Sequence, residues 1–442
     1  MRPPAQRAMR RLLTSPWIRR WRIPLAVAMT LLATSVFPQS ALLDLTNPGA
    51  MPAGALHVPF SYQIIAPLSD LLDILTFLTP AQYWGILWMI AAGFVAYATV
   101  TWSSDRSRAT RRHVLRNGLR FVVALVGLGE LILVARRPMA SLVLQDPDLL
   151  AVDFHSHTSA SHDGRAGFDA EQSRAWHSSA GFDAAYVTDH RTIEGAVSGD
   201  RGNPRFAGAG TVLLPGVELR DGDEHPILIG VDPLRTRITS ANWQPTVVEP
   251  DHGKTPPVLL LSLPGDILRI PFEMTNGLVK VVGIEMSDGS PRGIAQGSRD
   301  HDAILELARK TRLATVSASD NHGWGRAAAA WSVMRIPGWR EMTPSELDVA
   351  IRRTLIDEGP RAVQIVARRT APVPDTIAGA SLSGFAVGLL MLRTMTIADR
   401  ISWIAWTCAV CALLTLRVPQ RKRFGARIWA RSPQADDVDA AA

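Results

Sequence analysis

Apolar stretches of 15 to 20 residues occupy both end regions of this 442-residue chain, and they constrain its fold more than any other feature. They cover residues 23–37, 83–102, 121–135, 377–392 and 401–416. A helix of about 20 apolar residues crosses the hydrocarbon core of a bilayer, and Trp and Tyr near its ends anchor it in the interface. We therefore expect a multi-pass membrane protein with three spans in residues 1–137 and two in residues 373–417.

Arginines flank these stretches and carry most of the excess positive charge in a net charge of +7. Seven lie in residues 1–22 and six in the loop 106–120, and the tail 418–442 begins basic and ends acidic. Because basic loops stay in the cytoplasm, the first three spans place the middle of the chain on the other side of the membrane. We expect an inner-membrane protein whose central domain is periplasmic.

The two C-terminal spans conflict with this topology, because they would leave the basic tail on the periplasmic side. Either one of them is re-entrant, or residues 61–78, which contain Asp70 and Asp73 and are predicted to be interfacial or re-entrant, also span the membrane. The tail could instead bind anionic lipid headgroups. The arginines could also bind nucleic acid, but charge that flanks a membrane explains them without another partner.

Residues 138–372 have the composition of a soluble α/β domain, and both cysteines, Cys408 and Cys411, lie outside it in an apolar stretch, where we expect small buried side chains. Within this domain, runs rich in Val, Ile and Leu predict buried parallel strands, with helical segments such as 169–180 and 300–311 between them. The runs lie at residues 149–157, 184–190, 211–218, 225–231, 257–264, 281–286 and 313–322. Alternating strands and helices favour a (β/α) barrel with its active site at the carboxyl ends of the strands.

Two histidines end the first of these runs. His155 and His157 are two residues apart, so on a strand they point to the same face and can reach one ion. Asp163 follows after a short turn and adds an oxygen ligand. Later strand ends carry further groups of this kind: Asp189, His190, Glu218, His225, Glu285, Asp320 and His322. Imidazole and carboxylate together suit Mn, Zn or Fe, so the strand ends predict a metal site.

Five motifs occur in the order D-F-H-S-H-T-x-x-S-H-D-G, V-T-D-H, P-G-V-E, H-x-I-L-I-G and S-A-S-D-N-H. As an ordered set over residues 150–340 they resemble the PHP (polymerase and histidinol phosphatase) family of metal-dependent phosphoesterases. The resemblance implies an α/β fold, a distorted (β/α)7 barrel at residues 149–340, here flanked by N- and C-terminal transmembrane helices. We expect a linker or helix at residues 341–372. The resemblance also implies two or three divalent ions, Mn, Zn or Fe.

The resemblance assigns ligands by matching motifs. One ion would be held by His155, His157, Glu218 and Asp320, and a second by Asp163, His190 and His322. Glu218 would bridge to a third ion, with His225 as its ligand. Family members usually complete the third site with a histidine before a proline, but here Leu263 precedes Pro264. His252 lies nearby in the sequence and is expected to be a loop residue.

Further residues receive narrower expectations. Asp163, His190 and Glu218 are predicted to be catalytic as well as ligating. The guanidinium groups that follow the ligand motifs are expected to clamp phosphate oxygens of the substrate: Arg165, Arg191 and Arg326. His162 is expected to lie outside the site and His177 on a helix surface. Asp153 and Asp189 could orient an imidazole or cap a helix, and Glu285 is expected to be structural or to support a ligand.

The leading hypothesis is a membrane-anchored phosphoesterase that hydrolyses a phosphomonoester or phosphodiester with a metal-activated water. Its partners would be the lipid bilayer and a phosphorylated small molecule or nucleotide; the sequence indicates no oligomeric state. The alternative, favoured by Leu263, is a non-catalytic membrane protein that binds metal and senses a phosphorylated ligand. Barrel amidohydrolases also begin with H-x-H, but no strand-end lysine is placed here to bridge metals.

Overall fold

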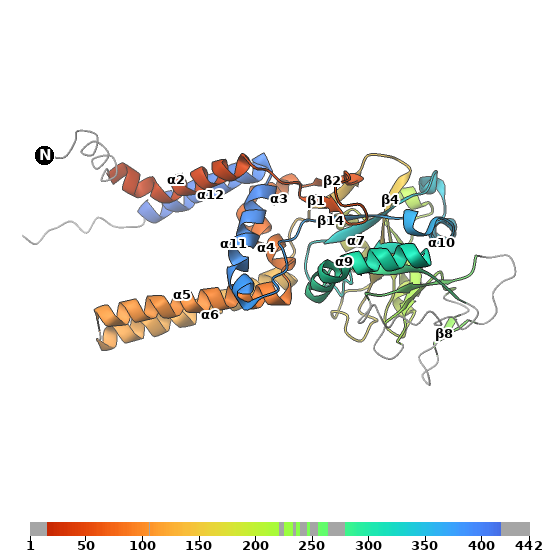
Figure 1. Cartoon of the computed structure of the whole chain (residues 1–442), viewed down its shortest axis with the longest axis horizontal. Helices are drawn as coiled ribbons and strands as arrows, with labels where there is room; N and C mark the ends of the chain where they lie inside the picture. The colour runs from red at the N-terminus through yellow and green to blue at the C-terminus, as the bar shows by residue number, and fades with distance from the viewer. Residues whose placement is uncertain are drawn as a thin grey trace, which may run out of the picture. The chain divides into compact units, whose positions relative to one another are not determined.

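The computed structural model describes residues 16–105, 107–220, 225–232, 236–238, 245–247, 255–263 and 279–416. The chain divides into two compact units, one formed by residues 1–33 and 400–442 and the other by residues 34–399. The first unit is built on helices α2 (Pro16–Ser35) and α12 (Ile397–Leu416), which lie side by side (Figure 1). The guanidinium of Arg400 donates a hydrogen bond to the carbonyl of Leu31 and so joins the two helices.

Among the described residues, four helices are long and apolar enough to cross a membrane, which is consistent with a membrane protein. They are α5 (Pro80–Ser104), α6 (Arg108–Val134), α11 (Ile377–Thr394) and residues 397–414 of α12. The first predicted span lies in α2, whose apolar part, residues 21–35, is shorter. Gly85 allows α5 and α11 to approach closely, because a Cβ atom at this position would collide with the carbonyl of Ala380.

The prediction of a basic loop at residues 106–120 is wrong, because its arginines from Arg108 onward lie in α6. Ser107 caps this helix by accepting a hydrogen bond from the amide of Thr110. Arginine is a good helix former, so the helix extends through the basic residues into the apolar stretch that follows. α5 and α6 therefore form a helical hairpin, in which the rings of Phe94 and Phe121 stack with centroids 6.4 Å apart.

Residues 61–78 contain two short helices, α3 (Phe60–Ile64) and α4 (Ala66–Thr76). Asp73 is buried and has three partners from distant parts of the chain. Its carboxylate lies 2.9 Å from Arg137 Nη2 and 2.8 Å from Arg368 Nη1, and it accepts a hydrogen bond of 3.2 Å from Tyr62. An ion pair with two guanidinium groups thus fastens α4 to the α/β part of the chain.

A curled ten-stranded sheet forms the centre of the second unit. Its hydrogen-bonded order is β1 (Leu42–Asp44), β14 (Gln364–Arg368), β13 (Ala330–Arg335), β4 (Leu149–Ser156), β5 (Ala184–Val187), β6 (Val212–Glu218), β7 (Ile227–Ile229), β10 (Val258–Leu261), β11 (Lys280–Ser287) and β12 (Ala314–Ser317). Each of the seven predicted runs contains a strand of this sheet. Two separate ribbons pair β2 (Gly54–His57) with β3 (Ser141–Leu144) and β8 (Thr236–Ile238) with β9 (Pro245–Val247).

The sheet is mixed, so the expectation of parallel strands throughout is wrong. β4, β5 and β6 are parallel to one another, as are β10, β11 and β12, but β7 is antiparallel to both of its neighbours. Only a short connection separates β6 from β7, whereas a parallel pair needs a crossover of about a dozen residues or more. This reversal places the start of β7, rather than its end, beside the carboxyl end of β6.

One edge strand of the sheet, β12, curls back to contact β4 and β13. A backbone bridge between Ser156 and Asn321 brings the loop after β12 to the end of β4. The amide of Ser317 in β12 also donates to the hydroxyl of Ser332 in β13, at 2.8 Å. Within the described residues the strand order nevertheless runs from β1 to β12 without a continuous ladder between them. The structure therefore shows an α/β fold with a curled sheet, and the closed seven-stranded barrel stays a prediction.

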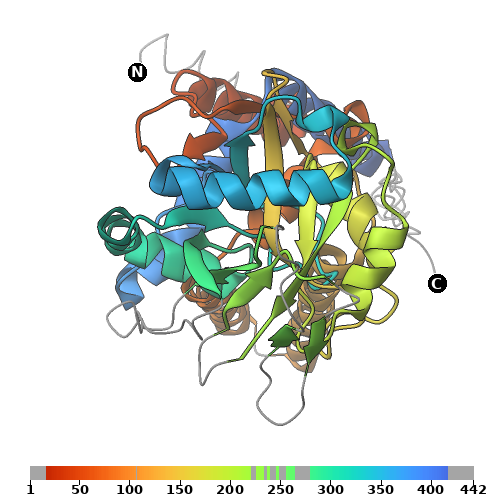
Figure 2. The same cartoon turned by 90° about the vertical axis from the view of Figure 1, so that its right-hand side faces the viewer.

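Helices and short turns cover the sheet. They are α7 (Ala170–Ala180), α8 (Glu194–Arg201), α9 (Pro291–Thr311), α10 (Pro344–Glu358), and the 3-10 turns η1 (Ala207–Ala209), η3 (Trp339–Glu341) and η4 (Gly359–Arg361). Figure 2 shows α10 lying across the strands. Residues 341–372, expected to be a linker or helix, thus contribute α10 and strand β14 to the α/β fold.

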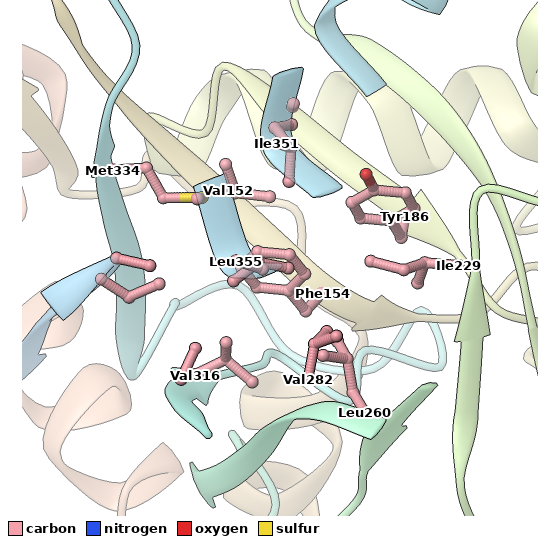
Figure 3. Packing of buried hydrophobic residues seen from close by; sticks show 14 of the residues in the cluster. Val152, Phe154, Tyr186, Ile229, Leu260, Val282, Val316, Met334, Ile351 and Leu355 are labelled. Atoms are coloured by element: carbon pink, nitrogen blue, oxygen red, sulfur yellow. The ribbon is translucent and has the colours of Figure 1, made fainter. Parts of the chain in front are cut away.

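The core lies between the sheet and α10. Phe154 of β4 stacks on Tyr186 of β5 with ring centroids 5.7 Å apart, and both side chains are fully buried. Ile351 and Leu355 of α10 reach the same cluster from the other side (Figure 3). The apolar side chains of β4 that lie on the same face as Phe154 anchor the strand in the core. His155 and the residues that follow therefore lie at the end of the strand.

Candidate metal centre

Histidines and carboxylates from several strand ends gather in one place, which we call the histidine–carboxylate centre. Seven of the predicted ligands belong to groups whose ligand atoms lie within 4.8 Å of one another: His155, His157, Asp163, His190, Glu218, His225 and His322. The eighth, Asp320, joins them through Oδ1, which is 3.5 Å from His157 Nε2. The structure therefore brings together all eight residues that the sequence singled out as metal ligands.

His155, near the end of β4, and His157, just after the strand, are both buried in this centre. Their Nε2 atoms are only 2.9 Å apart, close enough to share a proton or a cation, since two ring nitrogens repel when both present lone pairs. His157 also stacks on His322 with ring centroids 4.0 Å apart. The Nδ1 atom of His157 is buried and has no hydrogen-bond partner among the described residues. This arrangement fits a site whose missing partner is a cation.

Glu218, at the end of β6, contacts more imidazoles than any other carboxylate of the centre. Its Oε2 lies 2.9 Å from His155 Nε2, 3.2 Å from His157 Nε2 and 3.4 Å from His190 Nδ1. Its Oε1 lies 2.8 Å from Nδ1 of His225, the residue two positions before β7. The antiparallel course of β7 is what brings His225 here. A carboxylate surrounded in this way is suited to bridge two ions.

The open edge of the centre is formed by Asp163, His190 and His322. Asp163 Oδ2 lies 3.3 Å from the Nε2 atom of each of these two histidines. Its other oxygen accepts a hydrogen bond of 2.7 Å from Ser161. The side chain of Asp163 is 40% exposed, against 4% for Glu218, so solvent reaches the centre at this edge.

Asp320 takes a backbone conformation that is rare for residues other than glycine, with φ at +47°. Its amide donates a hydrogen bond of 3.0 Å to the carbonyl of His155, which ties the loop after β12 to the end of β4. Such strain persists only where the surroundings hold it, and it is common in functional sites. The conformation lets Asp320 Oδ1 lie 3.5 Å from His322 Nδ1.

Burial and close charges shift the pKa values of these groups in opposite directions. Burial alone would lower the pKa of His155, but Glu218 and Glu285 raise it well above its ordinary value. Burial lowers the pKa of His190 to about 4, so its imidazole is neutral at pH 7. Burial opposes ionisation of Glu218, but His155 and the other imidazoles around it lower its pKa far below the usual range. The carboxylates of the centre are thus held ionised in the absence of metal.

Glu285 of β11 supports His155 from below. Its Oε1 lies 3.0 Å from His155 Nδ1, the ring nitrogen that faces away from Glu218. Its Oε2 accepts a hydrogen bond of 3.0 Å from the amide of Leu263. A buried carboxylate in this position fixes the orientation and tautomer of a metal-binding imidazole. The Leu263 side chain packs against the main core, and His252 and Pro264 lie outside the described residues.

His177 is fully buried, so the expectation of a surface residue is wrong. Its Nε2 lies 2.8 Å from Asp153 Oδ2, and both side chains have no exposed area. The other oxygen of Asp153 accepts hydrogen bonds from the amides of Ser319 and His155, at 2.9 and 3.3 Å. Helical spacing alone did not show which face of α7 packs on β4. The pair holds the two loops that present His157 and Asp320.

Asp189 does not contact the ring of His190 in the structure. Its carboxylate accepts two hydrogen bonds from Thr158, one from the amide at 2.6 Å and one from the hydroxyl at 2.8 Å. It therefore fastens the turn after His157 to the end of β5. The expectation that His162 lies outside the site is wrong: it forms a group of possible metal ligands with Asp163 and His190, its ring is 5.0 Å from that of His190, and its Nδ1 is 3.7 Å from Asp163 Oδ1.

Two of the three predicted substrate arginines lie beside the loop that carries His322. The amide of Arg165 donates a hydrogen bond of 2.9 Å to the carbonyl of His322, and its guanidinium lies 5.9 Å from the ring of Trp324. Burial and the charges of Arg137, Arg136 and Arg165 lower the pKa of Arg326. Sequence reasoning missed Arg136 and Arg137, since they directly follow a predicted span and carry no motif. The third arginine, Arg191, has φ at +61°, and its amide donates to the carbonyl of Glu218 at 3.4 Å.

No protein-family model and no curated protein matches the chain. Among solved structures it is similar to PsfC from Pseudomonas syringae, at 16% identity over 54% of this chain and 96% of that one, with a TM-score of 0.30. It is also similar to a two-domain protein from Bacteroides vulgatus described as containing a predicted PHP-like metal-dependent phosphoesterase (18% identity, 53% and 70% coverage, TM-score 0.28). A third similar structure is an amidohydrolase from Chromobacterium violaceum, at 15% identity over 49% of this chain and 97% of that one, with a TM-score of 0.27. Likeness at this level does not define a reaction, which must be argued from the chain's own residues.

Proposed function

We propose that this chain is a membrane-anchored, metal-dependent phosphoesterase that hydrolyses a phosphomonoester or phosphodiester. The observation that carries the proposal is the carboxylate of Glu218, which lies within 3.4 Å of four imidazoles, those of His155, His157, His190 and His225. Together with Asp163, Asp320 and His322 this set would hold two or three ions of Mn, Zn or Fe. The ordered motifs of the PHP resemblance, and the barrel that it implies for residues 149–340, support the same class.

Bound divalent ions would supply a water of lowered pKa and would polarise the phosphoryl group. Side chains of this protein lie around the place where the ions would bind. His190 is neutral at pH 7 and lies 3.3 Å from Asp163, so this pair offers an imidazole nitrogen and a carboxylate oxygen that can hold an ion at the open edge. Arg165, whose amide donates to the carbonyl of His322, and Arg326, four residues after His322, are candidates to bind phosphate oxygens. Arg191 is a further candidate for this role.

We propose that the protein lies in an inner membrane with its hydrolase domain in the periplasm, a proposal that the apolar helices and the arginines flanking them support. The substrate would be a phosphorylated small molecule or nucleotide, and nucleic acid is not favoured. We propose the same organisation as the sequence suggests: membrane regions at residues 1–137 and 373–417 around one hydrolase domain. The four apolar helices α5, α6, α11 and α12 support the anchoring.

The test uses the full chain, purified in detergent without chelator. Elemental mass spectrometry should find two or more transition ions per chain. Hydrolysis of p-nitrophenyl phosphate or its diester should stop with EDTA and return with Mn²⁺ or Zn²⁺. His157→Ala and Asp320→Ala should lose both metal and turnover, whereas His113→Ala, which alters an exposed histidine of α6, should retain both. Hydrolysis that survives chelation would contradict the proposal.

One observation favours a second candidate. The side chain of Leu263 packs against the core, in the place where family members have a ligand for the third ion. A non-catalytic domain that binds metal and senses a phosphorylated ligand would fit this loss. It predicts that the protein binds inorganic phosphate in a metal-dependent way but turns over neither ester with any divalent metal.

A further inference from the structure

Four arginines lie near one another, and of the four only Arg137 has an acidic partner among the described residues; we call them the arginine cluster: Arg136, Arg137, Arg165 and Arg326. Their charges are close enough for the other three to lower the pKa of Arg326, after the larger effect of its burial. Two of the four directly follow α6, and the other two lie in the loops after β4 and β12. The cluster is therefore made only by the tertiary structure.

The cluster has too little negative charge of its own. Arg137 is buried and pairs with Asp73, but Asp73 also pairs with Arg368. The Nε and Nη1 atoms of Arg137, and the Nε atoms of Arg165 and Arg326, are buried without a hydrogen-bond partner among the described residues. Guanidinium groups that lose water and gain no acceptor are unfavourable unless an anion joins them. The unsatisfied donors point to an anionic ligand.

The cluster lies between the histidine–carboxylate centre and the end of α6. On one side, the amide of Arg165 donates to the carbonyl of the ligand His322. On the other, the amide of Gly325, in the same loop as His322, donates a hydrogen bond of 2.9 Å to the carbonyl of Leu133, near the end of α6. One loop thus connects the candidate metal site with the end of a helix that is apolar enough to span a membrane.

Exposed apolar side chains surround this connection. Leu131, Leu133 and Val134 in the last turn of α6 are exposed, and so is Trp324, at 48%. Trp324 lies beneath the guanidinium of Arg165, 5.9 Å away. A tryptophan beside basic residues at the end of an apolar helix is typical of the membrane–water interface. The arginine cluster would therefore face lipid headgroups.

We propose that the substrate reaches the site from the membrane and is a phosphate-bearing amphiphile, whose anionic headgroup binds the arginine cluster while its chains lie along the end of α6. This rests on the proposed phosphoesterase function and names its substrate class. The phosphate that binds the arginines is held next to the open edge formed by Asp163 and His190. Trp324 contacts the region between headgroup and chains.

The test measures binding in the absence of metal, so that it does not depend on turnover. Full-length protein in dodecyl maltoside with EDTA is titrated with radiolabelled dioleoyl phosphatidic acid in mixed micelles, and separately with glycerol 3-phosphate. We expect the lipid to bind at least tenfold more tightly than glycerol 3-phosphate, and inorganic phosphate to compete with it. Equal affinity for the two would overturn the membrane origin of the substrate.

Variants then locate the binding site. Arg165→Gln combined with Arg326→Gln should weaken lipid binding at least tenfold, and Arg326→Lys should retain part of it. Arg205→Gln is the matched control, because Arg205 also stacks on an aromatic ring, that of Phe206 at 5.0 Å, but lies outside the cluster. Trp324→Ala should weaken binding of the lipid more than that of glycerol 3-phosphate. Unchanged lipid binding in the double variant would overturn the proposal.

The two proposals fail separately. Loss of p-nitrophenyl phosphate hydrolysis under every metal, with lipid binding intact, would count against the phosphoesterase and leave the lipid site standing. Hydrolysis of p-nitrophenyl phosphate without preferential binding of the lipid would count against the lipid site and leave the phosphoesterase standing. The metal content of each variant shows that its fold is retained, since the ligands come from several strands.

Discussion

Two buried carboxylates of the second unit, Asp73 and Glu218, have partners of different chemistry. Asp73 is held by Arg137 and Arg368. Glu218 is surrounded by imidazoles, which lie between 2.8 and 3.4 Å from its oxygens. Arginine stays charged at every ordinary pH, whereas histidine gains or loses its proton near neutrality.

The difference explains why one carboxylate is structural and the other is a candidate ligand. The charge of Asp73 is permanently balanced, so the pair can fasten α4 to β14 and needs no further ion. The charge of Glu218 is balanced only when its histidines are protonated, and a divalent cation can replace those protons. The predictions below test this contrast, in order of expected effect.

The largest effect is expected from Glu218→Gln, which keeps the size of the side chain and removes its charge. Metal content should fall below one ion per chain, and turnover should fall by at least about a thousandfold, which corresponds to about 4 kcal/mol of activation free energy. Elemental analysis and ester hydrolysis measure the two. A variant with full metal content and turnover would make Glu218 structural, like Asp73.

Asp73→Asn should have the opposite profile. It leaves two guanidinium groups without their buried counter-ion, which destabilises a protein by about 3–5 kcal/mol. The melting temperature in detergent should therefore fall by about 10 °C, while the metal content of the folded protein stays at the wild-type value. Asp302→Asn, at a fully exposed position, is the control and should change neither. Loss of metal in folded Asp73→Asn would break the contrast between the two regions.

Glu285→Gln tests the support beneath His155. Loss of a carboxylate that orients a metal-binding imidazole weakens metal affinity by about 10- to 100-fold. We expect the dissociation constant for Zn²⁺ to rise by this factor, with turnover restored when metal is saturating. Glu306→Gln, on the exposed face of α9, should leave the affinity unchanged. Turnover that stays low at saturating metal would mean that Glu285 does more than position His155.

The smallest effect concerns Asp183, which lies away from both regions and accepts a hydrogen bond of 2.8 Å from the amide of Ala151. Burial raises its pKa to about 6. The folded state therefore holds a proton that the unfolded state releases near pH 4, and stability contributed by this group falls as pH rises from about 4 to 6. Asp183→Asn should be more stable than wild type at pH 7 by on the order of 1 to 2 kcal/mol.

The check on Asp183 is the difference in melting temperature between the variant and wild type across this pH range. It should be small at pH 4, grow towards pH 6 and then level off. A difference that does not change with pH would mean that Asp183 is ionised throughout this range.

Local patterns predicted a good part of the fold and of the candidate site. Val, Ile and Leu runs marked the strands of the central segment, because buried strands need continuous apolar side chains. His155 and His157 could be assigned to one face from their spacing alone. Their grouping with Glu218 and Asp320 followed from the strand ends and the PHP resemblance, and the structure places them together.

Other features could not be predicted because they depend on distant parts of the chain. The burial of His177 against Asp153 requires α7 to pack on β4, which no pattern within the helix shows. The apolar pattern also marked only the second half of α6, since the arginines of its first half carry no hydrophobic signal. β13 and β14, which pair with each other, were missed because their short runs mix apolar with polar residues, as in Gln364–Arg368, and so give a weak strand signal.

The sequence by itself determined the chemical inventory: apolar helices at both ends, strand-like runs between them, and histidines and acids where those runs end. These follow from side-chain type and local spacing. Only the tertiary structure decided which charged side chains lie next to one another. It gave Asp73 two arginines, gave Glu218 a ring of histidines, and left Arg165 and Arg326 without an acidic partner among the described residues, because charge balance depends on distances between residues far apart in the chain.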